Sequence, residues 1–222
     1  MKKLSCKLTE FPNLRERVYQ VLKEIIIFQE IPPGEKIDEE SLANQLGVSR
    51  TPIRESLCRL ENEGIVKVIP RRGAFVIKHS RERIIEILLV REVLEGLAAR
   101  EAVNHITDAT LEVLESLFEK LSESNIRVLS KEYVQADIRF HNTVIETSKN
   151  AWLINLMNIL NDHIQMLRLR TVALQGRPEQ SLSEHNKIIG ALKARDPLLA
   201  ESVMREHIKN IRESCLRNIE GS

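Results

Sequence analysis

The sequence predicts a mainly α-helical protein, with an N-terminal winged helix-turn-helix and an all-α C-terminal antiparallel helical bundle. Glycine (8 residues), proline (7) and aromatic side chains (4%) are scarce among the 222 residues, which favours helices over a β-sandwich. Apolar residues recur at helical spacing along most of the chain. Alternating β-branched residues around a Pro/Gly turn are confined to residues 65–78 and indicate one small β-hairpin.

The first third of the chain follows the order helix, helix, helix, hairpin. A helix over about residues 14–29 ends at the turn IPPGEKI, and the short helix EESLANQL then ends at Gly47. Ser49 is placed to cap a second helix over about 50–63, which Gly64 stops. Two short helices joined by a tight glycine-containing turn form a helix-turn-helix. The segments IVKVI, PRRG and AFVIK form the hairpin, or wing.

From Ser80 onward the sequence contains only helix signals. The apolar periodicity and cap residues predict helices over about 80–104, 108–126, 130–148, 151–174, 179–195 and 197–219. We therefore expect a winged helix-turn-helix domain at residues 1–78 and an all-helical domain at residues 79–222.

Composition indicates a cytoplasmic protein with no membrane partner. Hydrophobic residues (42%) and charged residues (29%) are typical of a soluble chain with a core. The segment MKKLSCKLTEFP lacks the apolar core of a signal peptide, and the run IIEILLV is too short to span a bilayer. Three scattered cysteines without a CxxC motif favour a reducing compartment.

The stretch GVSRTPIRESL predicts a DNA-reading helix. Arg50 and Arg54 lie near its N-terminus, where the helix dipole disfavours cations, so we expect an anionic partner. Residues 47–78 carry seven Lys and Arg against three Asp and Glu. In a major groove, such arginines can each donate two hydrogen bonds to guanine, while Ser49 and Thr51 can donate to phosphate. The alternative is a solvated charged face on an ordinary helix.

The wing extends this predicted interface. Its tip carries Arg71 and Arg72, which would reach a neighbouring groove or the backbone of double-stranded DNA. One short recognition helix reads few base pairs, so a palindromic operator and a homodimer are expected.

The segment ESLANQLGVSRTPIRESLCRLENEGIVKVIPRRGAFV closely resembles the winged-helix domain of the GntR family of bacterial transcription factors. The resemblance covers most of residues 14–77 and includes the signature GVSRTPIRE followed by LENEG. It implies that Arg50 and Arg54 read bases, and that Ser49, Thr51 and Gly73 contact the backbone or minor groove. Glu40 departs from a family member that has a DNA-contacting arginine at this position, so that contact is not carried over.

The helical half contains a possible metal-ligand set. Asp137 and His141 are four residues apart on one helix and share a face. His185 and His207 are each 11 residues from Asp196, at the turn between two helices, so antiparallel packing would place them at the same height. Three imidazoles and one carboxylate suit Zn, Ni, Mn or Co. Four unrelated core or surface residues are the alternative. His163 lies across the Asn150 turn from His141 and is a candidate pocket residue.

Residues from Ser80 to about Glu213 resemble the FCD effector domain of the FadR-like subfamily, through VREVLEGLAAREA, ADIRFHNTV, SEHNKIIGALKARD and ESVMREHI. In metal-binding members the ligands correspond to Asp137, His141, His185 and His207. Arg91 corresponds to an arginine that binds an effector carboxylate; alternatively, it is a surface arginine paired with Glu95.

The resemblance implies a transcription regulator, expected to be a repressor, that responds to a small carboxylate. Two alternatives are a metal-dependent hydrolase using the Asp/His₃ site and a regulator with a purely structural metal. No HExxH motif places a glutamate beside these ligands, so we expect no enzyme activity.

Overall fold

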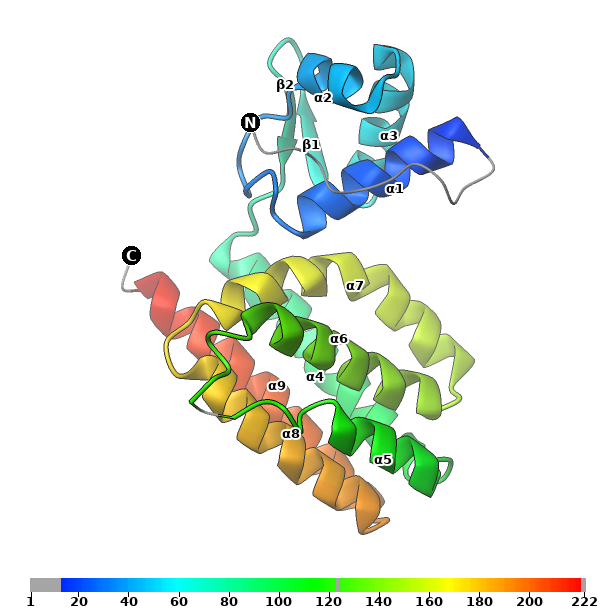
Figure 1. The fold of residues 1–222 in the computed structure, drawn as a ribbon, viewed down its shortest axis with the longest axis vertical. Helices are drawn as coiled ribbons and strands as arrows, with labels where there is room; N and C mark the ends of the chain where they lie inside the picture. Colours follow the sequence, from blue (N-terminus) through cyan, green and yellow to red (C-terminus); the bar gives the residue numbers. More distant parts are fainter. Residues whose placement is uncertain (1–12, 123, 221–222) are drawn as a thin grey trace. The chain divides into compact units, whose positions relative to one another are not determined.

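The computed structural model describes residues 13–122 and 124–220, and the chain divides into two compact units between His79 and Ser80 (Figure 1). The predicted fold class is confirmed: short helices and one hairpin make up the first unit, and helices make up the second. The segment MKKLSCKLTEFP, with Cys6, lies outside the described residues. No helix in the described part combines the length and apolar character needed to span a bilayer.

The first unit holds α1 (Leu14–Ile27), α2 (Glu39–Leu46) and α3 (Arg50–Asn62). Asp38 caps α2, because its Oδ1 accepts hydrogen bonds from the backbone N–H groups of Glu40 and Ser41. Gly47 ends α2 in the left-handed region, at φ +65°. The tight turn that follows places α3 directly after α2, as a helix-turn-helix requires.

The core of this unit forms where α1 packs on α3. Val18, Leu22 and Ile26 of α1 are fully buried, and α3 contributes Ile53 and Leu60. These positions follow helical spacing, so burying one face of α3 leaves its opposite face exposed to solvent. The core thereby fixes which side chains of α3 are available to a partner.

The wing is an antiparallel hairpin of β1 (Val66–Ile69) and β2 (Gly73–Val76), in which Ile69 pairs with Gly73 and Val66 with Val76. Gly73 has φ +107°, a conformation that side-chain-bearing residues rarely adopt. A Cβ atom here would also lie 3.0 Å from Cε of Lys36. Glycine is therefore required where the hairpin turns.

The second unit is a helical bundle built around α4 (Arg81–Ala102) and α9 (Pro197–Glu220), which make its most extensive contact. Also in this unit are α5 (Asp108–Ser116), α6 (Ser130–Thr147), α7 (Ala151–Val172) and α8 (Arg177–Lys193). Helices α6 and α7 pack on α4, and α8 packs on α9 (Figure 1). Phe140 of α6 and Ile188 of α8 are fully buried in the resulting core.

The prediction of one helix over residues 108–126 was wrong, because α5 ends at Ser116 and turns follow. The side chains beyond it bind the backbone: Asn125 Nδ2 donates to the carbonyl of Lys120, and Ser122 N donates to Asn125 Oδ1. Serine and asparagine compete in this way with helical hydrogen bonds, so the helix does not continue.

Candidate metal centre and nucleic-acid interface

Four side chains from three helices of the second unit converge on one point. Asp137 and His141 come from α6, His185 from α8 and His207 from α9, and one ligand atom of each lies within 4.8 Å of the others. The rings of His185 and His207 have centroids 4.7 Å apart, and those of His141 and His207 are 5.3 Å apart. The structure thus brings together the whole set that the sequence analysis grouped.

The cluster is buried, and four of its six ring nitrogen atoms lack a hydrogen-bond partner among the described residues. All four residues are at most 5% exposed. Among the described residues, Nε2 of His141, Nε2 of His207 and both ring nitrogens of His185 have no hydrogen-bond partner. Buried polar atoms are almost always hydrogen-bonded or ligated. Three imidazoles and a carboxylate with free nitrogen atoms therefore fit a divalent transition metal.

Two buried glutamates orient two of the imidazoles. Nδ1 of His141 contacts Oε2 of Glu95, and Nδ1 of His207 lies 2.6 Å from Oε2 of Glu184. An ionised carboxylate can only accept, so each Nδ1 carries a proton, and in the neutral form of either ring the lone pair lies on Nε2. Carboxylate–histidine pairs of this kind fix the tautomer that a metal needs.

Each carboxylate of this network pairs with a buried arginine. Nε of Arg91 lies 2.5 Å from Oε1 of Glu95. Arg177 pairs with Glu184, and Arg168 pairs with Asp137. Such buried charges need close partners because removing either member leaves an uncompensated charge.

The pKa shifts of His185 and His207 agree with neutral imidazoles beside charged carboxylates. Burial lowers the pKa of His207 to about 3 and also lowers that of His185. Burial alone would raise the pKa of Glu184, but hydrogen bonds from His207 and Arg177 outweigh it and bring the pKa to about 2. At neutral pH both imidazoles are therefore unprotonated and able to bind a metal.

His185 differs from His141 and His207 because its ring packs against aromatic side chains, and no glutamate in the described part of the chain is hydrogen-bonded to its Nδ1. Its ring stacks on Phe118 at a centroid distance of 4.8 Å and an interplanar angle of 18°. The Phe140 ring is tilted against the His185 ring, with their centroids 4.6 Å apart. Nε2 of His185 lies 3.2 Å from Oδ1 of Asp137. Packing therefore fixes the orientation of this ring.

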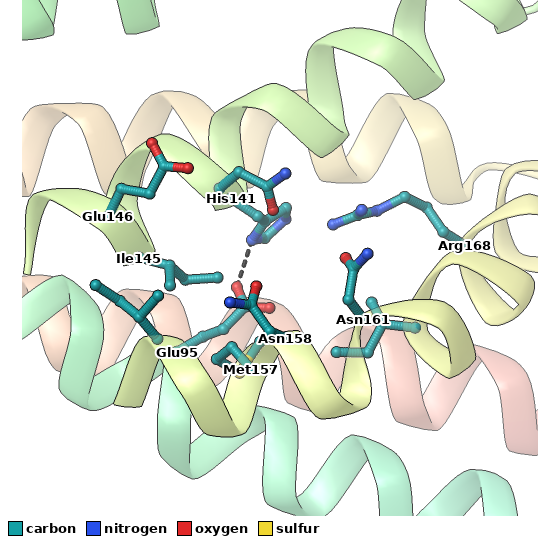
Figure 2. Close-up of a pocket in the computed structure, with 11 residues that line it drawn as sticks. Glu95, His141, Ile145, Glu146, Met157, Asn158, Asn161 and Arg168 are labelled. Atoms are coloured by element: carbon teal, nitrogen blue, oxygen red, sulfur yellow. Dashed lines mark hydrogen bonds and ion pairs between the residues drawn. The ribbon is translucent and has the colours of Figure 1, made fainter. Parts of the chain in front are cut away.

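A cavity of about 140 Å³ opens beside the cluster, between α4, α6 and α7 (Figure 2). Figure 2 shows Glu95 bound to His141 on one side and Arg168 directed toward His141 from the other. Besides these three, the lining side chains are mostly amide or apolar: Asn142, Ile145, Glu146, Ile154, Met157, Asn158, Asn161 and Ile164. Among the described lining residues, Arg168 is a cation that pairs with Asp137, and Glu95 and Glu146 are acidic.

The two residues predicted to bind the effector occupy different places. Arg91 pairs with Glu95 at i+4, as expected, but it is buried and not a surface residue. Its Nη2 has no hydrogen-bond partner among the described residues. It does not line the cavity. His163 lies half-buried on α7 and is also absent from the described lining, which includes Asn161 and Ile164.

Sequence reasoning missed Arg168, Arg177 and Glu184. Glu184 stands next to His185 in the sequence, but it binds His207 of the neighbouring helix. Adjacent residues of a helix point in different directions, so the Glu–His dipeptide gave no usable signal. Arg168 and Arg177 reach their partners only through tertiary packing.

The first unit presents a charged surface on α3. Arg50, Thr51 and Arg54 are exposed, opposite the buried side of the helix. Ser49 occupies the N-cap position, but its side chain makes no cap hydrogen bond, so its hydroxyl remains available to a partner. The two arginines pair with acidic residues of α2, Arg50 with Glu40 and Arg54 with Glu39.

The wing tip carries the other predicted DNA-contacting residues. Arg71 and Arg72 are exposed, and the guanidinium of Arg72 lies 6.0 Å from the centroid of the Phe75 ring. Gly73 closes the turn at half exposure. Arg71 and Arg72 project from the turn of a short hairpin, which is suited to a groove or phosphate contact.

Comparison with known proteins gives a separate family match for each of the two units of the chain. Residues 14–76 match the bacterial regulatory proteins of the gntR family, and residues 86–210 match the FCD domain. The HTH-type transcriptional repressor RspR of Escherichia coli K12 is 28% identical over 206 residues, covering 90% of this chain and 88% of that protein. The Nta operon transcriptional regulator of Aminobacter aminovorans is 30% identical over 190 residues, covering 86% and 89%. The solved structure of E. coli McbR/YncC has a TM-score of 0.77 at 24% identity, covering 94% of this chain and 100% of that one, and shares the fold.

Proposed function

Because the chain belongs to the GntR family of bacterial regulatory proteins and carries an FCD domain, we propose that it is a repressor whose operator binding is controlled by a small carboxylate at a metal site. Family membership makes it a transcription regulator rather than an enzyme. The observation that carries the finer proposal is the buried Asp/His₃ cluster beside a small cavity with one cationic wall residue. We place the protein in the cytoplasm with its DNA.

The metal would be held by Asp137, His141, His185 and His207. Its donor set suits Zn, Ni, Mn or Co. When bound, the ion supplies a positive charge that attracts an anionic oxygen. The chain itself supplies the fixed tautomers, through Glu95 and Glu184, and the arginine that keeps Asp137 ionised.

The effector would occupy the cavity next to His141. A dry cavity of about 150 Å³ can hold a benzene-sized molecule, so a cavity of about 140 Å³ suits a short acid of roughly six non-hydrogen atoms. Arg168 supplies a charged partner for its carboxylate, and Asn158 and Asn161 supply amide hydrogen bonds. Arg91, whose Nη2 is buried without a hydrogen-bond partner among the described residues, is a second cation that the effector could recruit. His163 would act from the next turn of α7.

The DNA contacts would come from α3 and the wing. Arg50 and Arg54 would donate to base edges in the major groove, with Ser49 and Thr51 on phosphates. Arg71, Arg72 and Gly73 would lie against the adjacent backbone or minor groove. This assignment rests on the exposure of the six side chains named here and on the partial exposure of Gly73 at the hairpin turn.

A homodimer would present two such heads to a palindromic operator. Helices α4 and α7, which pack on each other, expose large apolar side chains: Leu89, Val90 and Val93 on α4, and Trp152, Leu156 and Ile159 on α7. Trp152 and Ile159 are 80% and 72% exposed. Residues 151–161 contain no charged side chain. Exposed apolar side chains on two neighbouring helices are typical of a subunit interface, and a second copy of the chain would match them by symmetry.

Control by the effector requires that it bind one conformation of the protein more tightly than another. A purely structural metal is the second candidate, favoured by the depth at which the cluster is buried. The two proposals differ in whether a carboxylate binds through the metal.

The test combines metal analysis of the purified protein with a thermal-shift screen of short carboxylates, with and without a chelator, followed by DNA binding. We expect a stoichiometric divalent ion, a carboxylate that raises the unfolding temperature only in the metal-loaded protein, and altered DNA affinity in its presence. A bound metal with no carboxylate response would favour the structural role. Absence of any bound divalent ion would remove the proposal.

A further inference from the structure

Two consecutive glutamates of α2 contact the two predicted base-reading arginines of α3, but they hold different atoms. Glu39 Oε2 lies 2.7 Å from Nε of Arg54 and accepts its hydrogen bond. Glu40 Oε2 contacts Nη2 of Arg50. The Glu39 side chain is 25% exposed, whereas that of Glu40 is 68% exposed. One carboxylate is therefore partly built into the surface, and the other is largely in solvent.

The difference in atoms has a consequence for base recognition. An arginine reads guanine end-on through its two terminal nitrogens, which donate to O6 and N7. Glu39 contacts Nε of Arg54 and neither of its two Nη groups. Arg54 can therefore donate to a base through both Nη groups while its hydrogen bond to Glu39 remains in place. The Glu40 contact occupies Nη2 of Arg50, so Arg50 has to leave Glu40 before it can bind guanine with both nitrogens.

We propose that Glu39 is a positioning residue, which aims Arg54 at its base, and that Glu40 is a competitor, which holds Arg50 away from DNA until a matching site displaces it. The proposal rests on the reading of DNA by α3 stated above. Surface ion pairs contribute little to stability, so Glu40 can be displaced at small cost. An arginine already held by one hydrogen bond loses less conformational freedom when it binds, so Glu39 favours the specific complex.

A simpler role for both glutamates has to be separated from this one. They occupy the first turn of α2, where acidic side chains favour the helix dipole whatever they contact. That role predicts a lower unfolding temperature for either variant and the same effect on all DNA sequences. The proposed roles predict opposite effects on DNA binding from two substitutions of identical chemistry.

The experiment uses the full chain and two duplexes: one enriched from a random-sequence pool by the wild-type protein, and a scrambled duplex of the same composition. Affinities of the variants Glu39→Gln, Glu40→Gln and Glu30→Gln are measured by fluorescence anisotropy at several salt concentrations. Glu30 is an exposed residue of the same unit beyond the end of α1, so its variant controls for the loss of one negative charge. Circular dichroism melting controls for folding.

For Glu40→Gln we expect up to about fivefold tighter binding to both duplexes. Release of Arg50 adds a phosphate or base contact, so the slope of log affinity against log salt should steepen by up to about 0.9. For Glu39→Gln we expect about three- to tenfold weaker binding to the selected duplex and no loss on the scrambled one. Weaker binding after removal of a negative charge beside a polyanion cannot arise from charge alone.

A double-mutant cycle supplies the decisive readout. If Glu39 acts through Arg54, Glu39→Gln should cause no further loss in an Arg54→Ala background. Tighter binding by Glu39→Gln to both duplexes, or a loss that persists without Arg54, would overturn the proposal while leaving DNA reading by α3 intact. If the wild-type protein enriches no sequence at all, DNA reading by α3 fails and the roles of both glutamates fail with it.

Discussion

Glu184 offers the sharpest test of the buried network, because its carboxylate makes four contacts and replacing one oxygen with an NH₂ group disrupts two of them. Its Oε1 accepts from Nη1 of Arg177 at 3.1 Å and from Nδ2 of Asn210 at 2.8 Å. Its Oε2 contacts Nη2 of Arg177 and accepts from Nδ1 of His207 at 2.6 Å. Glutamine has a single acceptor oxygen, so in Glu184→Gln the NH₂ group must face two donors on one side.

The cost follows from these contacts. Hydrogen bonds to charged groups contribute about 1.5–3 kcal/mol each, and part of the loss is recovered if Asn210 turns its amide. We expect the metal-free variant to lose about 2–4 kcal/mol of unfolding free energy, measured by urea denaturation and circular dichroism. If the NH₂ group faces His207, the ring proton moves to Nε2 and that nitrogen can no longer bind a metal. Zinc affinity, measured by chelator competition, should fall about 10–100-fold.

Glu179→Gln is the matched control. Glu179 lies in the first turn of the same helix, and its partly buried carboxylate binds Arg127, whose side chain is 54% exposed, at 2.7 Å. This variant should change the unfolding free energy by at most about 1 kcal/mol and leave zinc affinity unaltered. Equal zinc affinity for Glu184→Gln and Glu179→Gln would refute the role of Glu184 in holding the His207 tautomer.

Three further predictions test the other parts of the proposed function. His207→Ala should abolish tight metal binding while circular dichroism shows a folded chain; a normal metal content, measured by mass spectrometry, would contradict the ligand set. Arg54→Ala should cost about 1–3 kcal/mol of binding to a selected duplex and relax base preference at one position, whereas an equal loss on all sequences would indicate a phosphate contact. Ile159→Glu places a charge on the apolar face of α7 and should dissociate the dimer in analytical ultracentrifugation, while the same change at Asn125, outside that face, should not.

Much of the fold could be predicted from local signals, because periodicity, caps and glycine stops act over a few residues. Asp38, Gly47 and Ser80 mark helix ends in the structure as they do in the sequence. The shortened α5 could not be predicted, because its end depends on side-chain hydrogen bonds around Asn125 that compete with an otherwise helical pattern.

For the candidate metal site, residue spacing along the helices was enough to predict which ligand side chains meet. The equal distance of His185 and His207 from the turn at Asp196 predicted their meeting, and the i+4 relation of Asp137 and His141 placed them on one face. The hydrogen-bond and ion-pair partners of these residues could not be predicted from the sequence. Glu184 and Arg168 bind across helices, and the sequence alone gives neither the helix pairing nor the rotation of each helix about its axis.

The charges of the buried network around the Asp/His cluster explain why an anion would bind there together with a metal ion. Among the described residues, the buried arginines and carboxylates are Arg91, Arg168 and Arg177 against Glu95, Asp137 and Glu184, so the network is neutral when the imidazoles are unprotonated. A divalent ion adds two positive charges to a region with little water to screen them. A dicarboxylate would restore neutrality, whereas acetate would leave one charge uncompensated. We therefore expect calorimetry to show tighter binding of malonate than of acetate in the zinc-loaded protein, and a much smaller difference after chelation. An equal preference with and without zinc would mean that Arg168 alone attracts the anion.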